Sequence, residues 1–265
     1  MSHYSEKGKA GEDRAQHEDH VEKMREYYCR TAKEYNNAHC GDDGSHDFAT
    51  QKVLELLKAI DSGTLLDVCC GTGRCISLAL SAGYDARGTD ISQDLLNVGI
   101  KEFGLPPDRI YCGDATKLPF PDRCFDITCI LGALHHTAMP LSIVEEMLRV
   151  TRHGIVVSDE ANHLHGAIRS ILMKLGIFDL VYRVIFRREP KTKRRMMVSE
   201  GDGPTFDFSI EEILPLIRDH FNEVKTTSFV RMGKHQFQLG WWPRFFATQA
   251  VVVAKGRKDV SGSVT

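Results

Sequence analysis

Residues 64–74 have the sequence Thr-Leu-Leu-Asp-Val-Cys-Cys-Gly-Thr-Gly-Arg, and this stretch decides the fold. Its first five residues form an apolar run, rich in Leu and containing one acid, that is typical of a buried parallel strand. Gly71 and Gly73 then predict a tight turn, and the apolar positions of residues 76–80 predict a helix. A strand, a glycine turn and a helix N-terminus expose backbone N–H groups that bind polar or anionic ligands. The stretch therefore predicts a nucleotide-type cofactor site.

The spacing within the turn separates several classes of nucleotide site. A dinucleotide fold needs the third glycine of G-x-G-x-x-G, but Cys75 and Ile76 stand there instead. The G-x-x-x-x-G-K-[ST] pattern of a P-loop does not occur in the sequence. The stretch resembles motif I of the class I S-adenosylmethionine-dependent methyltransferases, with a cysteine in place of the first glycine. This resemblance implies S-adenosylmethionine as cofactor, bound by Asp67, Cys69, Cys70, Gly71, Thr72 and Gly73.

An acid ends the second predicted strand, residues 84–89. Asp90 follows the first turn by about 20 residues, a position that suits a carboxylate accepting hydrogen bonds from two ribose hydroxyls. The alternative role is the N-cap of the helix predicted over residues 93–101, for which Ser92 is also placed. We assign Asp90 to the cofactor, with Ile91 beside it.

The next two predicted strands, residues 109–112 and 124–131, extend the alternation. In the resembled family an acid after the third strand receives the adenine amino group, and an adjacent backbone N–H meets a ring nitrogen. The resemblance thus adds Asp114 and its neighbours to the cofactor-binding residues, together with the end of the fourth strand. These additional positions are Gly113, Asp114, Ala115 and Leu131.

Two histidines follow the fourth predicted strand, at the carboxyl edge where open α/β sheets bind ligands. Histidine can act as a base near neutral pH, or its hydrogen bonds can fix the loop. The resemblance favours His136 over His135 as the candidate general base. The strand predicted over residues 154–158 ends beside further polar residues, and without a second ligand cluster no metal site is predicted. The expected substrate pocket contains Tyr28, Tyr35, His135, His136, Asn162 and His163.

Residues 1–16 are polar without apolar periodicity and predict a flexible tail. From Val21 to Tyr35, apolar and aromatic residues recur every three or four positions, which predicts one face of a helix. The pattern Tyr-Tyr-x-x-x-Ala-x-x-Tyr that ends there is similar to an element covering the cofactor in many small-molecule methyltransferases. The resemblance makes residues 17–45 a helical lid, in which Tyr28 contacts the cofactor and Tyr28 and Tyr35 line the pocket.

Residues 162–208 follow the fifth predicted strand as an insertion. Residues 164–186 have a helical apolar pattern, and residues 187–195 contain six cations and one acid. In the resembled family this position commonly carries the cover of the substrate site. The basic run is open to three interpretations: a solvated loop, a site for an anionic acceptor, or contact with an anionic membrane surface.

The order of elements predicts the α/β class. The resemblance implies one Rossmann-like, doubly wound domain over residues 17–255, whose seven-stranded sheet is mostly parallel with the last strand antiparallel, and a tail over residues 256–265. A net charge of −2 gives no general attraction to nucleic acid, and no apolar N-terminal stretch is present. We expect a cytoplasmic protein without a transmembrane segment or nucleic-acid partner. The cysteines form no C-x-x-C pair, so we interpret them as small apolar residues.

The predicted activity is methyl transfer from S-adenosylmethionine to an O, N or C nucleophile of a small molecule. In-line displacement needs alignment of the two reactants and, for some acceptors, removal of a proton. Other acceptors stay open, namely a lipid or quinone, an RNA or a protein. A cofactor-binding partner subunit without catalysis is a further alternative, since a fold does not fix a function. The sequence does not set the oligomeric state.

Overall fold

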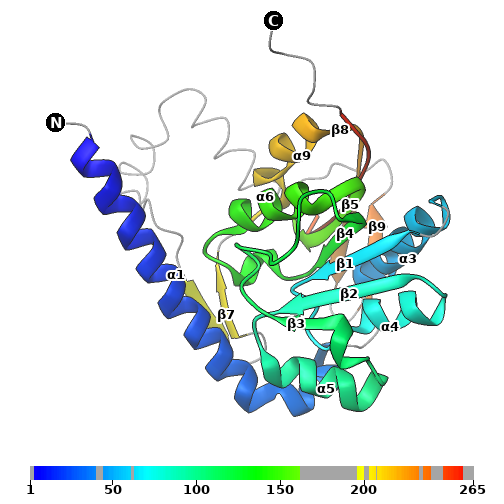
Figure 1. Cartoon of the computed structure of the whole chain (residues 1–265), viewed down its shortest axis with the longest axis horizontal. Helices are drawn as coiled ribbons and strands as arrows, with labels where there is room; N and C mark the ends of the chain where they lie inside the picture. Colours follow the sequence, from blue (N-terminus) through cyan, green and yellow to red (C-terminus); the bar gives the residue numbers. More distant parts are fainter. Residues whose placement is uncertain are drawn as a thin grey trace, which may run out of the picture.

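A central sheet with helices on both faces forms the body of the molecule (Figure 1). The computed structural model describes residues 3–39, 44–60, 63–161, 196–199, 203–206, 208–232, 235–239 and 247–258. Within these residues the sheet has eight strands in the order β3-β2-β1-β4-β5-β10-β8-β9. Its parallel half consists of β1 (Thr64–Val68), β2 (Asp85–Asp90), β3 (Ile110–Cys112), β4 (Phe125–Leu131) and β5 (Thr151–Glu160).

The other three strands close the sheet on the far side of β5. Strand β10 (Gln249–Arg257) runs antiparallel to both of its neighbours, β5 and β8 (Phe221–Met232). The predicted seven-stranded, mostly parallel sheet with its last strand antiparallel is therefore confirmed. Strand β9 (His235–Leu239), which the sequence did not predict, pairs with β8 and adds an eighth strand at the edge.

Two apolar layers hold the helices on the sheet. Helices α3 (Gly44–Lys58), α4 (Arg74–Ser81) and α5 (Gln93–Phe103) cover one face, while α6 (Pro140–Val150) and α9 (Leu214–His220) cover the other. In β1, Leu66 and Val68 pack toward α6 and Leu65 packs toward α3 and α4, each fully buried. A central parallel strand is apolar on both faces for this reason. The order reverses between β1 and β4, so a ligand crevice is expected at the carboxyl ends of these strands.

The N-terminal helix extends beyond its predicted start. Helix α1 spans His3–Thr31, so residues 3–16 of the predicted flexible tail are helical. Residues 6–15 are rich in Glu, Lys, Ala and Arg, which favour a helix even without an apolar stripe. The 3₁₀ turn η1 (Ala32–Glu34) and the short helix α2 (Tyr35–His39) continue the chain. In Figure 1, α1 runs along one side of the molecule past β7 (Gly203–Phe206) toward α5.

The insertion 162–208 contains a hairpin that the sequence did not predict. Strands β6 (Met196–Ser199) and β7 pair antiparallel as a separate two-stranded sheet, after the predicted helix 164–186. The predicted helix 164–186 and the basic run 187–195 lie outside the described residues. The predicted tail 256–265 starts two residues early, because β10 continues to Arg257. Among the described helices, none combines the length and apolar character needed to span a bilayer.

Candidate active site

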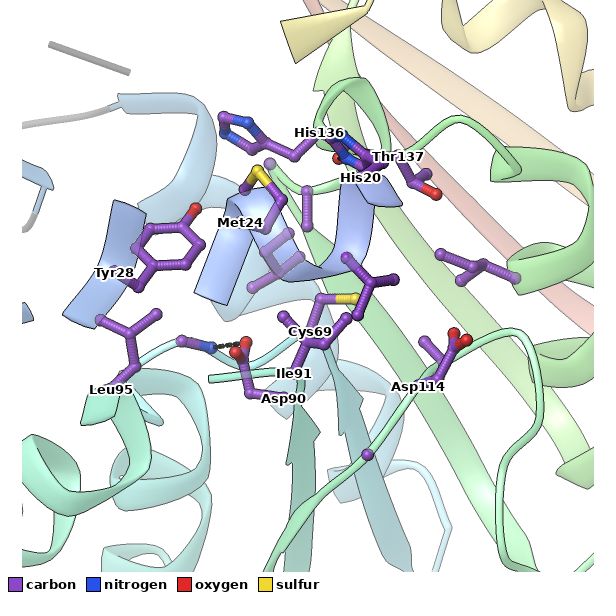
Figure 2. A pocket seen from close by; sticks show the side chains of 18 of the residues that line it. His20, Met24, Tyr28, Cys69, Asp90, Ile91, Leu95, Asp114, His136 and Thr137 are labelled. Carbon is purple, nitrogen blue, oxygen red and sulfur yellow. Dashed lines mark hydrogen bonds between the residues drawn. The ribbon is translucent and has the colours of Figure 1, made fainter. Parts of the chain in front are cut away.

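A cavity opens at the carboxyl ends of β1, β2 and β4, where the strand order predicts a ligand crevice, and helix α1 crosses over it (Figure 2). It contains about 700 Å³ of empty space, part of which is open to solvent. Helix α1 and the strand ends both contribute polar and apolar side chains to its lining. The lining residues include Val21, Met24, Tyr28, Cys69, Asp90, Ile91, Leu95, Asp114, Leu131, His136 and Ile143.

Asp90 is the most deeply buried acid of this cavity, with 6% of its surface exposed. Its Oδ2 accepts a hydrogen bond from the Gly71 N–H at 2.8 Å, and its Oδ1 accepts one from the Ser92 N–H at 2.9 Å. Burial raises the pKa of Asp90, although these backbone N–H groups act in the opposite direction. The N-cap of α5 is Ser92, whose Oγ accepts the Leu95 N–H at 3.3 Å. The capping role proposed as the alternative for Asp90 is therefore filled by Ser92.

Asp114 lies on the opposite wall of the cavity, after β3 (Figure 2). Its Oδ1 accepts hydrogen bonds from the backbone N–H and hydroxyl of Thr116, at 2.8 and 2.9 Å. The Nε2–H of His17 donates to Oδ2 at 2.8 Å. Burial raises the pKa of Asp114, but the hydrogen bonds from His17 and Thr116 outweigh it and lower the pKa to about 2. Asp114 is thus an ionised acceptor across the physiological range.

The aromatic residues of the N-terminal segment lie where the resemblance implies. Tyr28 is buried and packs with Leu95 in a cluster that Tyr35 joins, and the ring centroids of Tyr28 and Tyr35 are 5.9 Å apart.

 Since Leu95 belongs to α5, this cluster joins the N-terminal segment to the helix that packs beside β2 and β3. The Tyr35 hydroxyl lies 3.2 Å from the place that a Cβ on Gly71 would take, so a side chain there would crowd this ring, and the φ of +57° also favours glycine.

The two histidines after β4 have different surroundings. The Nδ1–H of His135 donates to Asp159 Oδ1 at 2.8 Å, and the Leu134 N–H donates to Asp159 Oδ2 at 2.7 Å. Burial raises the pKa of Asp159, but the charge and hydrogen bond of His135 outweigh it, so the pKa is lowered. His135 is buried and does not line the cavity, which gives it the role of fixing the loop.

His136 lines the cavity, as predicted for the candidate base. Its Nδ1 lies 2.9 Å from the carbonyl oxygen of Pro204 in β7. Because a carbonyl oxygen only accepts, Nδ1 carries the proton, and in the neutral ring Nε2 has the lone pair. His136 therefore has the tautomer that a general base needs at Nε2. Asn162 and His163, the other predicted pocket residues after the fifth strand, lie outside the described residues.

Four of the predicted cofactor residues do not line the cavity: Asp67, Cys70, Thr72 and Gly73. The Thr72 hydroxyl donates to Asn36 Oδ1 at 2.6 Å and so ties the turn to α2. Asp67 points instead into the core, where the Cys129 thiol donates to its Oδ1 at 3.3 Å. Burial raises the pKa of Asp67 to about 7, which strand periodicity alone did not indicate.

Replacing Asp67 by Asn tests this raised pKa. The folded protein holds the Asp67 proton up to about pH 7, whereas the unfolded chain releases it near pH 4, so wild-type stability falls as the pH rises between these values. Asn imitates the protonated acid and lacks this loss. We expect the free energy of unfolding of Asp67→Asn, relative to that of the wild type, to increase by roughly 2–3 kcal/mol between about pH 5 and about pH 8. Urea unfolding at both pH values measures it, and parallel pH profiles for the two proteins would contradict the assignment.

Cys69 stands at the first glycine position of the motif and has a φ of +55°, in the left-handed region. In this region the backbone conformation of a residue with a Cβ is less stable by about 1 kcal/mol, whereas glycine has no such cost. Burial raises the pKa of the Cys69 thiol well above its usual value, so the group lining the cavity is a neutral thiol. The turn thus follows the glycine path despite the cysteine.

We expect Cys69→Gly to retain cofactor affinity and to change stability by no more than about 1 kcal/mol, because relief of the left-handed strain offsets the greater freedom of the unfolded chain. Cys70→Gly is the matched comparison. Cys70 has no positive φ, and its thiol packs close to Gly88, so its loss should cost more stability. Thermal unfolding and calorimetric titration measure both variants. A folded Cys69→Gly variant that no longer binds the cofactor would contradict the inferred path.

Sequence analysis missed several residues of α1 that line the cavity, above all His17, His20 and Met24. His20 is 4% exposed, and its Nε2–H donates to the carbonyl oxygen of His136 at 2.6 Å. Burial lowers the pKa of His20, which favours the neutral ring. A signal was available, because positions 17, 20, 24 and 28 continue the helical face of Tyr28 toward the N-terminus. Because His17 and His20 are polar, the apolar periodicity did not include them.

Comparison with known proteins places this site in a family. The Methyltransferase domain family matches residues 66–157, from β1 through most of β5. The demethylmenaquinone methyltransferase of Bacillus subtilis is 34% identical over 200 residues, which are 72% of this chain and 84% of that protein. The enzyme of the same name from Renibacterium salmoninarum is 34% identical over 121 residues, or 45% of this chain. That match spans 50% of the relative, so the chain spans about half the length of this protein.

A solved structure shares the fold. The 1,6-didemethyltoxoflavin-N1-methyltransferase of Burkholderia thailandensis, crystallised with 1,6-didemethyltoxoflavin and S-adenosylhomocysteine, superposes with a TM-score of 0.56. The match covers 91% of each chain at 14% identity, a level at which the likeness concerns the fold. The sequence match to the Bacillus subtilis protein extends over most of both chains, and the family match over residues 66–157 includes most of the predicted motif I. This chain belongs to the class I S-adenosylmethionine-dependent methyltransferases.

Proposed function

We propose that this protein transfers a methyl group from S-adenosylmethionine to a small apolar ring compound bearing hydroxyl groups, with a reduced quinone as the first candidate acceptor. The observation that carries the proposal is the pairing of two acids, Asp90 and Asp114, with apolar and aromatic side chains around one cavity at the carboxyl edge. The names of the relatives, demethylmenaquinone methyltransferases, support a quinone-type acceptor.

The lining residues fit the cofactor. In this proposal Asp90 accepts hydrogen bonds from the ribose hydroxyls, Asp114 accepts one from the adenine amino group, and the backbone around Gly71 contacts the amino-acid end. The bound cofactor supplies an activated methyl group on a sulfonium centre. The protein then acts by holding the acceptor in line with that methyl group and by excluding water.

The acceptor side of the cavity provides an apolar wall and one candidate base. Met24, Leu131 and Ile143 line the cavity and exclude water from the reacting groups. His136 Nε2 takes the hydroxyl proton of an acceptor, since Nδ1–H is engaged by Pro204. When a phenolic hydroxyl loses its proton, electron density rises on its oxygen and on the ring carbons. The oxygen or a ring carbon is then a better nucleophile.

A labelling experiment tests this function. Purified protein is incubated with methyl-labelled S-adenosylmethionine and, separately, with a reduced naphthoquinone that lacks its ring methyl group, a cell metabolite extract, total RNA or total protein. The expected product is the naphthoquinol carrying one labelled methyl group, identified by mass spectrometry. Label in another small molecule of the extract would identify that molecule, and not the naphthoquinol, as the acceptor. Label in RNA or protein, or cofactor binding without transfer to any of these, would overturn the proposal.

A further inference from the structure

His17 and His20 lie one turn apart on the face of α1 that lines the cavity, and they contact opposite sides of it. The Nε2–H of His17 donates to Asp114 Oδ2 at 2.8 Å, after β3. The Nε2–H of His20 donates to the carbonyl oxygen of His136 at 2.6 Å, after β4. A single turn of α1 therefore connects the side of the cavity assigned to the cofactor with the side assigned to the acceptor.

The hydrogen bond from His17 leaves Asp114 able to bind a ligand. A carboxylate oxygen has two lone-pair sites. Oδ1 accepts two hydrogen bonds from Thr116, whereas Oδ2 accepts the one from His17. Asp114 still lines the cavity with α1 in place, so Oδ2 can accept from His17 and from a ligand amino group together. Closure of α1 and binding at Asp114 are compatible.

Two further contacts fix the same helix over the cavity. Arg25 Nε donates to the carbonyl oxygen of Ile91 at 3.3 Å, beyond the end of β2. The Tyr27 ring packs on the backbone of Gly203 in β7, where a Cβ would lie only 2.7 Å from the ring. Helix α1 is thus fixed to the loops after β2, β3 and β4 and to the hairpin, and His17 and His20 supply its hydrogen bonds to the loops after β3 and β4.

We propose that His17 and His20 are positioning residues that close α1 over the bound cofactor and align the two halves of the active site. This inference rests on the proposed methyl transfer. His17 shares Asp114 Oδ2 with the adenine amino group, so closure of the helix and cofactor binding stabilise each other. His20 holds the backbone of His136, while Pro204 holds its ring, so the candidate base is fixed at two points.

Single variants separate the two roles. His17→Ala should raise the Kd for S-adenosylhomocysteine about 10-fold, the lower end of the effect of losing a hydrogen bond to a charged group. His20→Ala should leave that Kd within about 2-fold and lower kcat about 10-fold, because the backbone carbonyl beside the base loses its donor. Glu26→Ala, on the exposed face of α1, is the control and should change neither value. Calorimetry and steady-state kinetics measure them.

Conservative replacements distinguish positioning from mere packing. The amide nitrogen of Gln reaches about as far as imidazole Nε2, so His17→Gln and His20→Gln should recover most of the lost affinity and kcat. The shorter Asn side chain should recover neither. Tighter binding of S-adenosylhomocysteine by His17→Ala would show that His17 competes with the ligand for Asp114, and would overturn the proposal. Equal effects of Gln and Ala in folded variants would overturn it as well.

Hydrogen exchange on the wild-type protein tests the closure without any substitution. Amides of residues 17–31 should exchange at least about 10-fold more slowly when S-adenosylhomocysteine is bound. Binding without added protection of this helix would overturn the closure and leave the proposed function intact. A wild-type protein that does not bind S-adenosylhomocysteine would overturn the proposed function, and this coupling with it.

Discussion

Replacing Asp90 by alanine is expected to raise the Kd for S-adenosylhomocysteine about 10- to 100-fold. The carboxylate is 6% exposed and orders both the Gly71 N–H and the Ser92 N–H, so its loss removes the proposed ribose acceptor and loosens the glycine turn. Charge-assisted hydrogen bonds contribute about 1.5–3 kcal/mol, which corresponds to this change in affinity. Calorimetric titration of the folded variant measures it.

Asp94 supplies the matched control for this experiment. It is an exposed acid in the first turn of α5, four positions after Asp90, and does not line the cavity. Asp94→Ala should leave the affinity within about 2-fold, since only a weak interaction with the helix dipole is lost. An Asp90→Ala variant that stays folded and binds as tightly as Asp94→Ala would remove Asp90 from the cofactor site.

Replacing Asp159 by alanine is expected to lower the free energy of unfolding by about 3–5 kcal/mol, because three hydrogen-bond donors lose a charged acceptor and each such bond contributes about 1.5–3 kcal/mol. The Asp159 side chain is fully buried and accepts hydrogen bonds from His135, the Leu134 N–H and the Glu160 N–H. Removing it leaves these donors without their acceptor in the core. Urea denaturation at neutral pH measures the loss. Glu145→Ala, an exposed acid on α6, should change stability by less than about 0.5 kcal/mol.

The pH dependence provides a second check on Asp159. Its pKa is lower in the folded protein than in the unfolded chain, so the stability it contributes is fully present above about pH 4. That contribution is lost as the pH falls through the folded pKa, because the folded protein must then take up the proton. The difference between wild type and Asp159→Ala should therefore shrink in acid. If the free energies of unfolding of wild type and Asp159→Ala differed by less than about 1 kcal/mol at neutral pH, this would contradict the buried pair.

The path of the chain around the glycine turn after β1 could be predicted from the sequence. The strand, the turn at Gly71 and the helix after it are local features, since apolar runs and glycines fix backbone conformation over a few residues. Asp90, Asp114 and His136 were placed correctly at the cavity for a related reason. Each follows a predicted strand, and parallel strands bring their carboxyl ends to one edge.

The direction of the Asp67 side chain was set by tertiary structure. Alternation along β1 sends residue 67 to the face that carries Cys129 of β4, with which it pairs in register. Motif position alone could not show this, because the neighbour comes from a strand far along the chain. The same limit applied to His135, whose partner Asp159 lies on β5.

The sequence by itself determined the α/β sheet, the glycine turn after β1 and the acids at the carboxyl edge of the sheet, because each depends on local backbone preference and on the order of strands. Only the tertiary structure decided how the N-terminal helix completes the site. His17 and Asp114 are 97 residues apart, and His20 and His136 are 116 apart. Residue type and periodicity carry no information on such pairings, which arise when the packing of α1 against α5 and β7 brings these side chains over the cavity.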